Sequence, residues 1–205
     1  MAYTGGLLNQ LNGKMGISAS EKSVPVMKLI RAHEPKSKEE LVELIKLHHT
    51  TKCKCGIRSQ GTVEDFGRNL YNSQLSYWGE YRFSLQECIQ WEYDLFVVQS
   101  LKGGLMEKKA ISELQKAIPQ KRFVEADAYI DEEMRVDIVV RSDNQDIAGI
   151  QVKPLTFKLM RKEVIDFNRA ANNSWTKPVL YLYYDSDEEF VNIPQLVKEI
   201  LTYSA

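Results

Sequence analysis

The 205-residue chain carries 27 Lys and Arg against 28 Asp and Glu, and its hydrophobic share is 43%. These values are typical of a soluble globular protein with one domain, or with a core domain and an extension. A net charge of −1 excludes a polycation, so a nucleic acid would have to bind at a local basic patch. Residues 1–60 have an excess of basic residues, with 10 Lys and Arg against 5 Asp and Glu.

The N-terminus lacks the basic start and apolar core of a signal peptide, and no apolar run approaches the roughly 18–20 residues that span a bilayer. The cysteines Cys53, Cys55 and Cys88 are odd in number, which indicates a reducing compartment. We therefore expect a cytoplasmic protein. A zinc site at His48, His49 and the first two cysteines is disfavoured, because C-x-C lacks the usual C-x2-C pairs.

The N-terminal region, residues 1–83, is predicted to be helical and rich in loops. Its composition indicates irregular structure over 1–24 and, because of four glycines and scattered aromatic residues, over 51–82. Helices are predicted over 24–33 and over 36–50, the second from a capping-box sequence at its start.

The remaining residues, 84–205, predict a core with a regular order of elements. The Gly103-Gly104 pair is expected to separate the first two helices. The predicted helices are 84–101, 105–118, 157–173 and 193–204, and the predicted strands are 121–130, 135–140, 147–154 and 177–184. This order indicates an α/β (α+β) fold, with a central mixed sheet of four or more strands flanked by helices.

Polar residues interrupt two of the predicted strands in the stretch "VDIVVRSDNQDIAGIQVKP", residues 136–154. Because side chains alternate along a strand, Asp137, Gln151 and Lys153 can share one face of a hairpin. Carboxylate and amide oxygens are ligands for a hard divalent cation such as Mg²⁺. A lysine beside the metal can orient water or neutralise charge on a phosphate. So loose a spacing also arises by chance, in a hairpin that merely has polar edges.

This stretch and its flanking elements resemble the PD-(D/E)XK nuclease superfamily. The run "SLQECIQWEYDLFVV", the following Gly-Gly and "GIQVKPLTF" are also similar to type II restriction endonucleases of the MjaI type, which read a CTAG-centred site. The resemblance implies a restriction-endonuclease-like core in which Asp137, Gln151 and the backbone carbonyl of Val152 hold Mg²⁺, or Mn²⁺ in its place. It also implies that Lys153 activates the attacking water and that Glu107 is an additional acid.

The sequence departs from the superfamily at Gln151, where Asp or Glu is usual. An amide still offers a carbonyl oxygen but carries no negative charge. Metal binding is therefore expected to be weaker unless Glu107 compensates.

The helix predicted after the motif has two faces. Met160, Val164, Phe167 and Ala171 form a stripe that we expect to pack on the core. The opposite face is basic and is either a solvated surface or a contact with DNA phosphates. The residues predicted to bind DNA are Lys158, Arg161, Lys162, Arg169, Asn172 and Asn173.

The sequence therefore predicts a Mg²⁺-dependent, sequence-specific endonuclease of double-stranded DNA, that is, a type II restriction enzyme. Cutting both strands of a palindrome suits a homodimer, and a cognate DNA methyltransferase is the expected genetic partner. Residues 1–83 are then expected to supply DNA recognition and dimerisation. Two alternatives remain open. One is a repair or junction nuclease that recognises DNA structure, and the other is a non-catalytic DNA-binding protein on the same fold.

Overall fold

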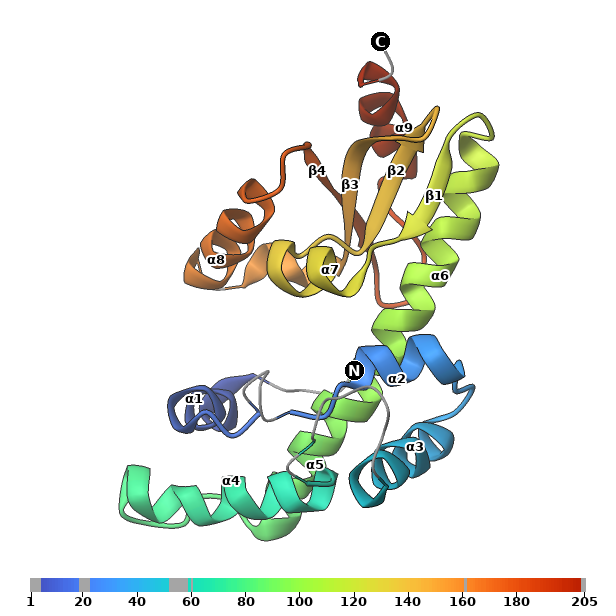
Figure 1. The fold of residues 1–205 in the computed structure, drawn as a ribbon. Coiled ribbons are helices and arrows are strands. Elements are labelled where there is room, and N and C mark those ends of the chain that lie inside the picture. Colours follow the sequence, from blue (N-terminus) through green and yellow to red (C-terminus); the bar gives the residue numbers. More distant parts are fainter. Residues whose placement is uncertain (1–4, 19–22, 52–58, 60, 161, 204–205) are drawn as a thin grey trace. The chain divides into compact units, whose positions relative to one another are not determined.

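The computed structural model describes residues 5–18, 23–51, 59, 61–160 and 162–203. The chain divides into two compact units, Met1–Gly104 and Leu105–Ala205 (Figure 1). Each unit has its own hydrophobic core, and each is described separately below. No helix in the described part of the chain is long and apolar enough to cross a membrane.

The first unit is helical throughout its described elements. These are α1 (Gly6–Met15), α2 (Val26–His33), α3 (Lys38–Thr50), α4 (Val63–Trp78), α5 (Leu85–Tyr93) and a π-helical turn, η1 (Asp94–Gln99), after which α6 (Ser100–Ala117) continues into the second unit. Two helices, α1 and α4, lie in segments predicted to be irregular, so that prediction was wrong. The start of α4 is fixed by a reciprocal capping box between Thr62 and Asp65, and α1 buries Leu8 and Leu11.

The Gly103-Gly104 pair does not break the helix as predicted, because α6 runs straight through it. A Cβ atom added at Gly104 would lie 2.9 Å from Cγ2 of Ile30, so this glycine allows a close approach of two helices. The expected division after residue 83 assigned α5 to the core domain. In the structure, Cys88 and Trp91 of α5 pack with Leu11 inside the first unit.

The second unit is built on a four-stranded mixed sheet, which confirms the predicted fold class. The strands β1 (Arg122–Glu125), β2 (Ile138–Ser142), β3 (Gln145–Pro154) and β4 (Val179–Tyr184) lie in the order β1-β2-β3-β4. The first three are antiparallel to their neighbours, whereas β4 is parallel to β3. The predicted strand 121–130 is only half right, because Asp127 caps a helix, α7 (Ala128–Met134), by accepting a hydrogen bond from the N–H of Ile130 (2.9 Å).

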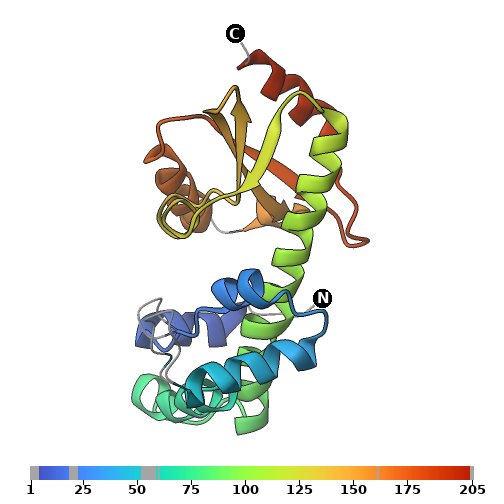
Figure 2. The same cartoon turned by 45° about the vertical axis from the view of Figure 1, so that its right-hand side comes forward.

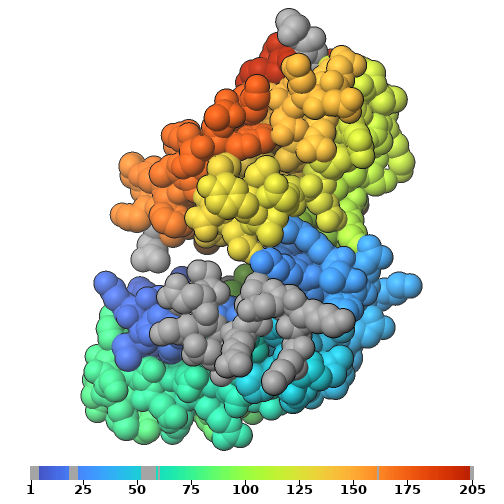
Figure 3. Space-filling model, in the orientation of Figure 1, coloured from blue at the N-terminus to red at the C-terminus, as the bar shows by residue number. Residues whose placement is uncertain are grey.

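The two faces of this sheet bury different helices. The alternate residues Ile138, Ile150 and Leu182 lie in a core cluster with residues of α6 and α9 (Ile193–Thr202). On the opposite face, Val139 packs with α7 residues and with Trp175, which follows α8 (Lys162–Asn173). Figures 1 and 2 show this arrangement, and Figure 3 shows α7 and α8 side by side at the surface of this unit.

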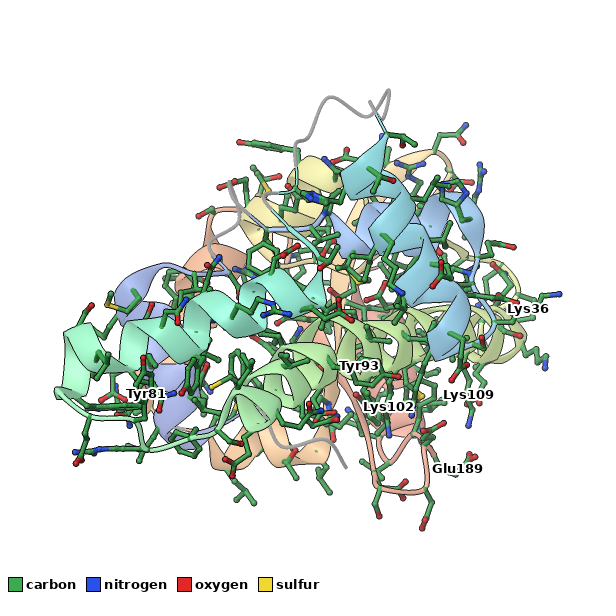
Figure 4. The ribbon with its side chains drawn as sticks, turned by 90° about the horizontal axis from the view of Figure 1, so that it is seen from below. Lys36, Tyr81, Tyr93, Lys102, Lys109 and Glu189 are labelled. Carbon is green, nitrogen blue, oxygen red and sulfur yellow. The ribbon has the colours of Figure 1, made fainter. Side chains whose placement is uncertain are left out.

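One contact ties α6 to the loop between β4 and α9. The Nζ atom of Lys109 donates to the carbonyl oxygen of Glu188 (2.7 Å) and forms an ion pair with Glu189 (2.8 Å). Figure 4 shows the labelled Lys109 and Glu189 side chains next to each other. This contact holds the middle of α6, which carries Glu107, against the loop that follows β4.

Candidate active site

Asp137 directly precedes the first residue of β2, and its backbone is hydrogen-bonded on both sides. Its N–H donates to the carbonyl oxygen of Ile150 (3.0 Å), and its own carbonyl oxygen accepts from the N–H of Ala126 (3.0 Å). The side chain is 8% exposed, and its Oδ2 accepts a hydrogen bond from the backbone N–H of Val152 at 2.7 Å. The backbones of two neighbouring strands therefore fix the direction of this carboxylate.

Lys153 lies next to this carboxylate, one residue beyond Val152 on β3. Its Nζ atom is 3.9 Å from Oδ2 of Asp137, and its side chain is 25% exposed. The pair thus joins a buried carboxylate to an ammonium that reaches solvent. Such a lysine can contact a phosphate or a water molecule that approaches Asp137 from outside.

Gln151 is fully buried and makes a reciprocal amide pair with Asn168 of α8. Nδ2 of Asn168 donates to Oε1 of Gln151 (2.9 Å), and Nε2 of Gln151 donates to Oδ1 of Asn168 (3.4 Å). Gln151 points to the α7 and α8 side of the sheet, since its neighbours Ile150 and Val152 lie in the opposite core cluster. The carbonyl oxygen of Gln151 keeps a second lone pair that can accept another partner.

Glu107 is buried on α6, on the other face of the sheet. Burial raises the pKa of the Tyr184 hydroxyl, and the charges of Glu188, Glu107 and Asp137 raise it further. The charges of both predicted acids therefore act on the pKa of this one tyrosine, at the end of β4. This places Glu107 and Asp137 in one electrostatic neighbourhood around Tyr184.

A family model described as MjaI restriction endonuclease matches residues 5–195. The chain belongs to the MjaI restriction endonuclease family. The protein is therefore a restriction endonuclease by family, a class of hydrolases that act on DNA. No curated protein and no solved structure matches the chain. The matched segment spans almost all of both units of this MjaI-family protein and contains Asp137, Gln151, Lys153 and Glu107.

Aromatic rings continue the candidate site of the MjaI-family protein along β4. In the parallel register Gln151 pairs with Tyr181 and Lys153 pairs with Tyr183, so these side chains lie on one face of the sheet. The ring of Tyr181 stacks on Tyr183, with centroids 5.9 Å apart, and on Phe157 at 6.0 Å. These stacked rings lie on the same face of the sheet as Lys153.

The predicted DNA-binding residues divide into two groups by position. Lys158 lies close to the site, with Nζ 4.1 Å above the Tyr183 ring. Burial raises the pKa of Tyr183, and the charge of Arg169 opposes that rise, so Arg169 is near the same ring. Lys162 is 84% exposed and ion-paired with Asp166.

The other predicted DNA contacts are placed differently. Arg161 lies outside the described residues, and Asn173 is exposed. Asn172 is buried, where its Nδ2 donates to the carbonyl oxygens of Met134 (2.9 Å) and Arg135 (3.1 Å). Its Oδ1 accepts from the Tyr181 hydroxyl (2.5 Å). Asn172 is thus a structural residue of this protein, and we leave it out of the proposed DNA contacts.

The prediction that the apolar stripe of α8 packs on the core was wrong. Met160 and Phe167 are 51% and 67% exposed, whereas Asn168 and Asn172 are the buried residues of the helix. The sheet surface under α8 carries the amide of Gln151 and the hydroxyl of Tyr181. These buried polar groups need hydrogen-bond partners, which asparagine side chains supply and alkyl side chains do not. Sequence reasoning missed Asn168, although two asparagines spaced i and i+4 were a visible signal for a polar helix face.

The donor set at Asp137 suits a hard cation. Within the described residues, no three His, Cys, Asp or Glu side chains gather as a metal site, and Cys53 and Cys55 lie outside those residues. A metal beside Asp137 would be held by one carboxylate, the Gln151 carbonyl oxygen and the backbone carbonyl of Val152. Mg²⁺ commonly binds proteins through one or two carboxylates and keeps several waters, so these residues fit it.

Proposed function

We propose that this MjaI-family protein is a Mg²⁺-dependent type II restriction endonuclease. It hydrolyses phosphodiester bonds of double-stranded DNA at a specific sequence, using a PD-(D/E)XK-type site. The observation that carries the proposal is the contact series from the Val152 N–H through Asp137 Oδ2 to Lys153 Nζ. Membership of the restriction endonuclease family supports it.

In this proposal, Asp137, the Gln151 carbonyl oxygen and the Val152 carbonyl hold the metal. Bound Mg²⁺ supplies a Lewis acid for the phosphate and lowers the pKa of a bound water. The Val152 N–H holds Oδ2 of Asp137 in place, which fixes the direction of the carboxylate that would hold the metal. The Asn168 amide fixes the direction of the Gln151 carbonyl in the same way.

Lys153 acts on the reacting atoms themselves. Its ammonium is partly exposed beside Asp137, so it can donate a hydrogen bond to the attacking water or to an oxygen of the scissile phosphate. Glu107 is the additional acid, and it supplies negative charge that the amide of Gln151 lacks. The stacked rings of Tyr181 and Tyr183 limit the space in which water can approach Lys153.

Lys158 and Arg169 are proposed to contact DNA phosphates beside this site, together with Arg161, Lys162 and Asn173. Phosphate contacts set the position of a duplex on the protein, whereas base contacts set its sequence. We propose that the first unit supplies base recognition and dimerisation. A homodimer would present two copies of Asp137 and Lys153 to a palindromic site, and a cognate methyltransferase would protect the host DNA.

The test is digestion of plasmid and phage DNA by the full chain in Mg²⁺. We expect discrete, reproducible fragments from the wild type and about 100-fold or slower cleavage by Lys153→Ala. Lys198→Ala is the matched control, because it removes an exposed lysine from α9 of the same unit. Cleavage confined to branched or mismatched DNA would favour a repair nuclease, and binding without cleavage would favour a non-catalytic protein.

A further inference from the structure

A polar pocket lies at the end of the sheet away from Asp137. Its volume is about 460 Å³, and it is lined by the connection between α6 and β1 and by the β2–β3 hairpin, including Lys121, Arg122, Arg141 and Asp143. Asp137 directly precedes the first residue of β2, whereas Arg141 and Ser142 end that strand. Figures 1 and 2 show the two connections side by side at that end. The pocket is therefore separate from the candidate active site.

Lys121 is the unusual residue of this pocket, because it is a lysine only 8% exposed. Its Nζ donates to the hydroxyl of Ser142 at 2.7 Å. Among the residues that the structure describes, this neutral hydroxyl is the only hydrogen-bonding partner of the ammonium. An ammonium has three N–H donors, so two of them remain available. A buried charge without a counter-charge is unfavourable, and an anion in the pocket would relieve that cost.

Neither carboxylate near the pocket makes a direct contact with the ammonium of Lys121. Asp146 forms an ion pair with Arg141, with its Oδ1 atom 2.7 Å from Nε of the arginine. Asp143 is exposed and reaches only the hydroxyl of Ser142, at 3.4 Å. Lys121, Arg122 and Arg141 therefore outnumber the two acids, and the local charge is positive.

The backbone around Lys121 is already fixed without a ligand. The Nε2 atom of Gln115 donates to the carbonyl oxygen of Lys121 (2.8 Å) and to that of Pro119 (3.4 Å). The N–H of Lys121 also donates to the carbonyl oxygen of Ile118 (3.1 Å). A cation held in place in this way binds an anion with little loss of conformational entropy.

We propose that this pocket binds a phosphate group, with Lys121 as its buried anchor and Arg122 and Arg141 at its mouth. A tetrahedral oxyanion can accept from the two available donors of Lys121 and from a guanidinium at the same time. The phosphate is either a free ion or a backbone phosphate of duplex DNA. Both have the same chemistry, and the experiment separates them.

The first measurement is calorimetric titration of the full chain with inorganic phosphate, in a buffer free of other oxyanions. We expect Lys121→Met, which keeps the length of the side chain and removes its charge, to weaken binding about tenfold or more. Lys116→Met is the matched control, since Lys116 is exposed on α6, and it should bind as the wild type does. Should Lys121→Met not fold, Arg122→Met removes an exposed cation of the same pocket and should weaken binding several-fold.

The second measurement is the salt dependence of binding to a short DNA duplex without Mg²⁺. If the ligand is a DNA phosphate, Lys121→Met lowers the slope of log affinity against log salt by about one. If the ligand is the free ion, the slope is unchanged and only the phosphate titration responds. The proposal is overturned if neither phosphate binding nor the salt slope differs between the wild type and the pocket variants. Either result is independent of whether the protein cleaves DNA.

Discussion

Asn168 pairs with Gln151 through both of its amide atoms, inside the interface between α8 and the sheet. A buried amide needs partners for its N–H groups as well as for its carbonyl oxygen, and Asn168 supplies both. This pair gives a structural reason for an amide at residue 151, where the PD-(D/E)XK superfamily that the stretch resembles has an acid. Helix α8 supplies the hydrogen-bond partner of Gln151, and this partner holds the carbonyl oxygen of Gln151 in a fixed direction.

Gln151→Glu should strengthen metal binding, because it adds a second carboxylate next to Asp137. Asn168 can still donate its N–H to the new carboxylate, whereas Oδ1 of Asn168 loses the N–H of Gln151, so the folding of the variant is checked beside its metal binding. We expect about tenfold tighter binding of Mg²⁺, equivalent to about 1.4 kcal/mol. Calorimetry with Mg²⁺ checks this, with the exposed Gln195→Glu as control. Unchanged or weaker binding by a folded Gln151→Glu protein would show that residue 151 is not at the metal.

Asn168→Ala should destabilise the second unit, because it leaves the amide of Gln151 buried without its partner. An unsatisfied buried polar group costs about 1–3 kcal/mol of unfolding free energy. Asn173→Ala on the same helix is exposed and should change that free energy by less than about 0.5 kcal/mol. Urea denaturation of the two variants provides the comparison. Equal stability of both would mean that the amide pair does not support the site.

The sheet and the motif were predictable because strands of this core show regular alternation of side chains. Gln151 and Lys153 follow a period of two, and their neighbours Ile150 and Val152 fill the opposite core. The contacts of Asp137 with β3 were not predictable from that period. The bond from Val152 N–H to Asp137 depends on the register of two strands, which a sequence does not show.

Two errors have physical causes in particular residues. For α8 the apolar side was taken as the buried side, but the sheet beneath it presents Gln151 and Tyr181, so Asn168 and Asn172 are buried instead. For α4 the scattered aromatic residues obscured the helical period. Its capping box, Thr62 with Asp65, was nevertheless readable in the sequence as T-x-x-D.

Glu92 should make the first unit less stable as pH rises. Burial raises the pKa of this carboxyl group to about 7, and the hydrogen bond from Ser18 (3.1 Å to Oε2) opposes the rise only in part. The folded protein therefore binds the proton more tightly than the unfolded chain does. The resulting stabilisation is complete below pH ~4.5 and is lost as pH rises to about 7.

Glu92→Gln removes this titration while keeping an oxygen that can accept from Ser18. Between pH 4.5 and 8 the stability of the wild type should therefore fall relative to the variant, by about 3 kcal/mol. Chemical denaturation at both pH values checks it, with the exposed Glu64→Gln as control. A difference that does not depend on pH would contradict the assignment to Glu92.

Gly149→Ala should destabilise the sheet where Trp175 covers it. A Cβ atom at this position would lie 2.4 Å from Cζ3 of Trp175 and 2.8 Å from Cγ1 of Val136. Overpacking of this kind costs about 1–3 kcal/mol. Gly103→Ala is the opposite case, since Gly103 lies within the first turns of α6 and its added Cβ would meet no atom within 4 Å. It should raise stability by about 0.5–1 kcal/mol, and thermal denaturation of both variants tests the contrast.

The most direct test of the proposed nuclease is the cleavage rate of Asp137→Asn in Mg²⁺. The asparagine oxygen can still accept from the Val152 N–H, so the melting temperature should stay close to that of the wild type. Loss of the carboxylate should slow cleavage of plasmid DNA by more than about 100-fold while DNA binding persists. A folded Asp137→Asn protein that cuts DNA at the wild-type rate would contradict the account.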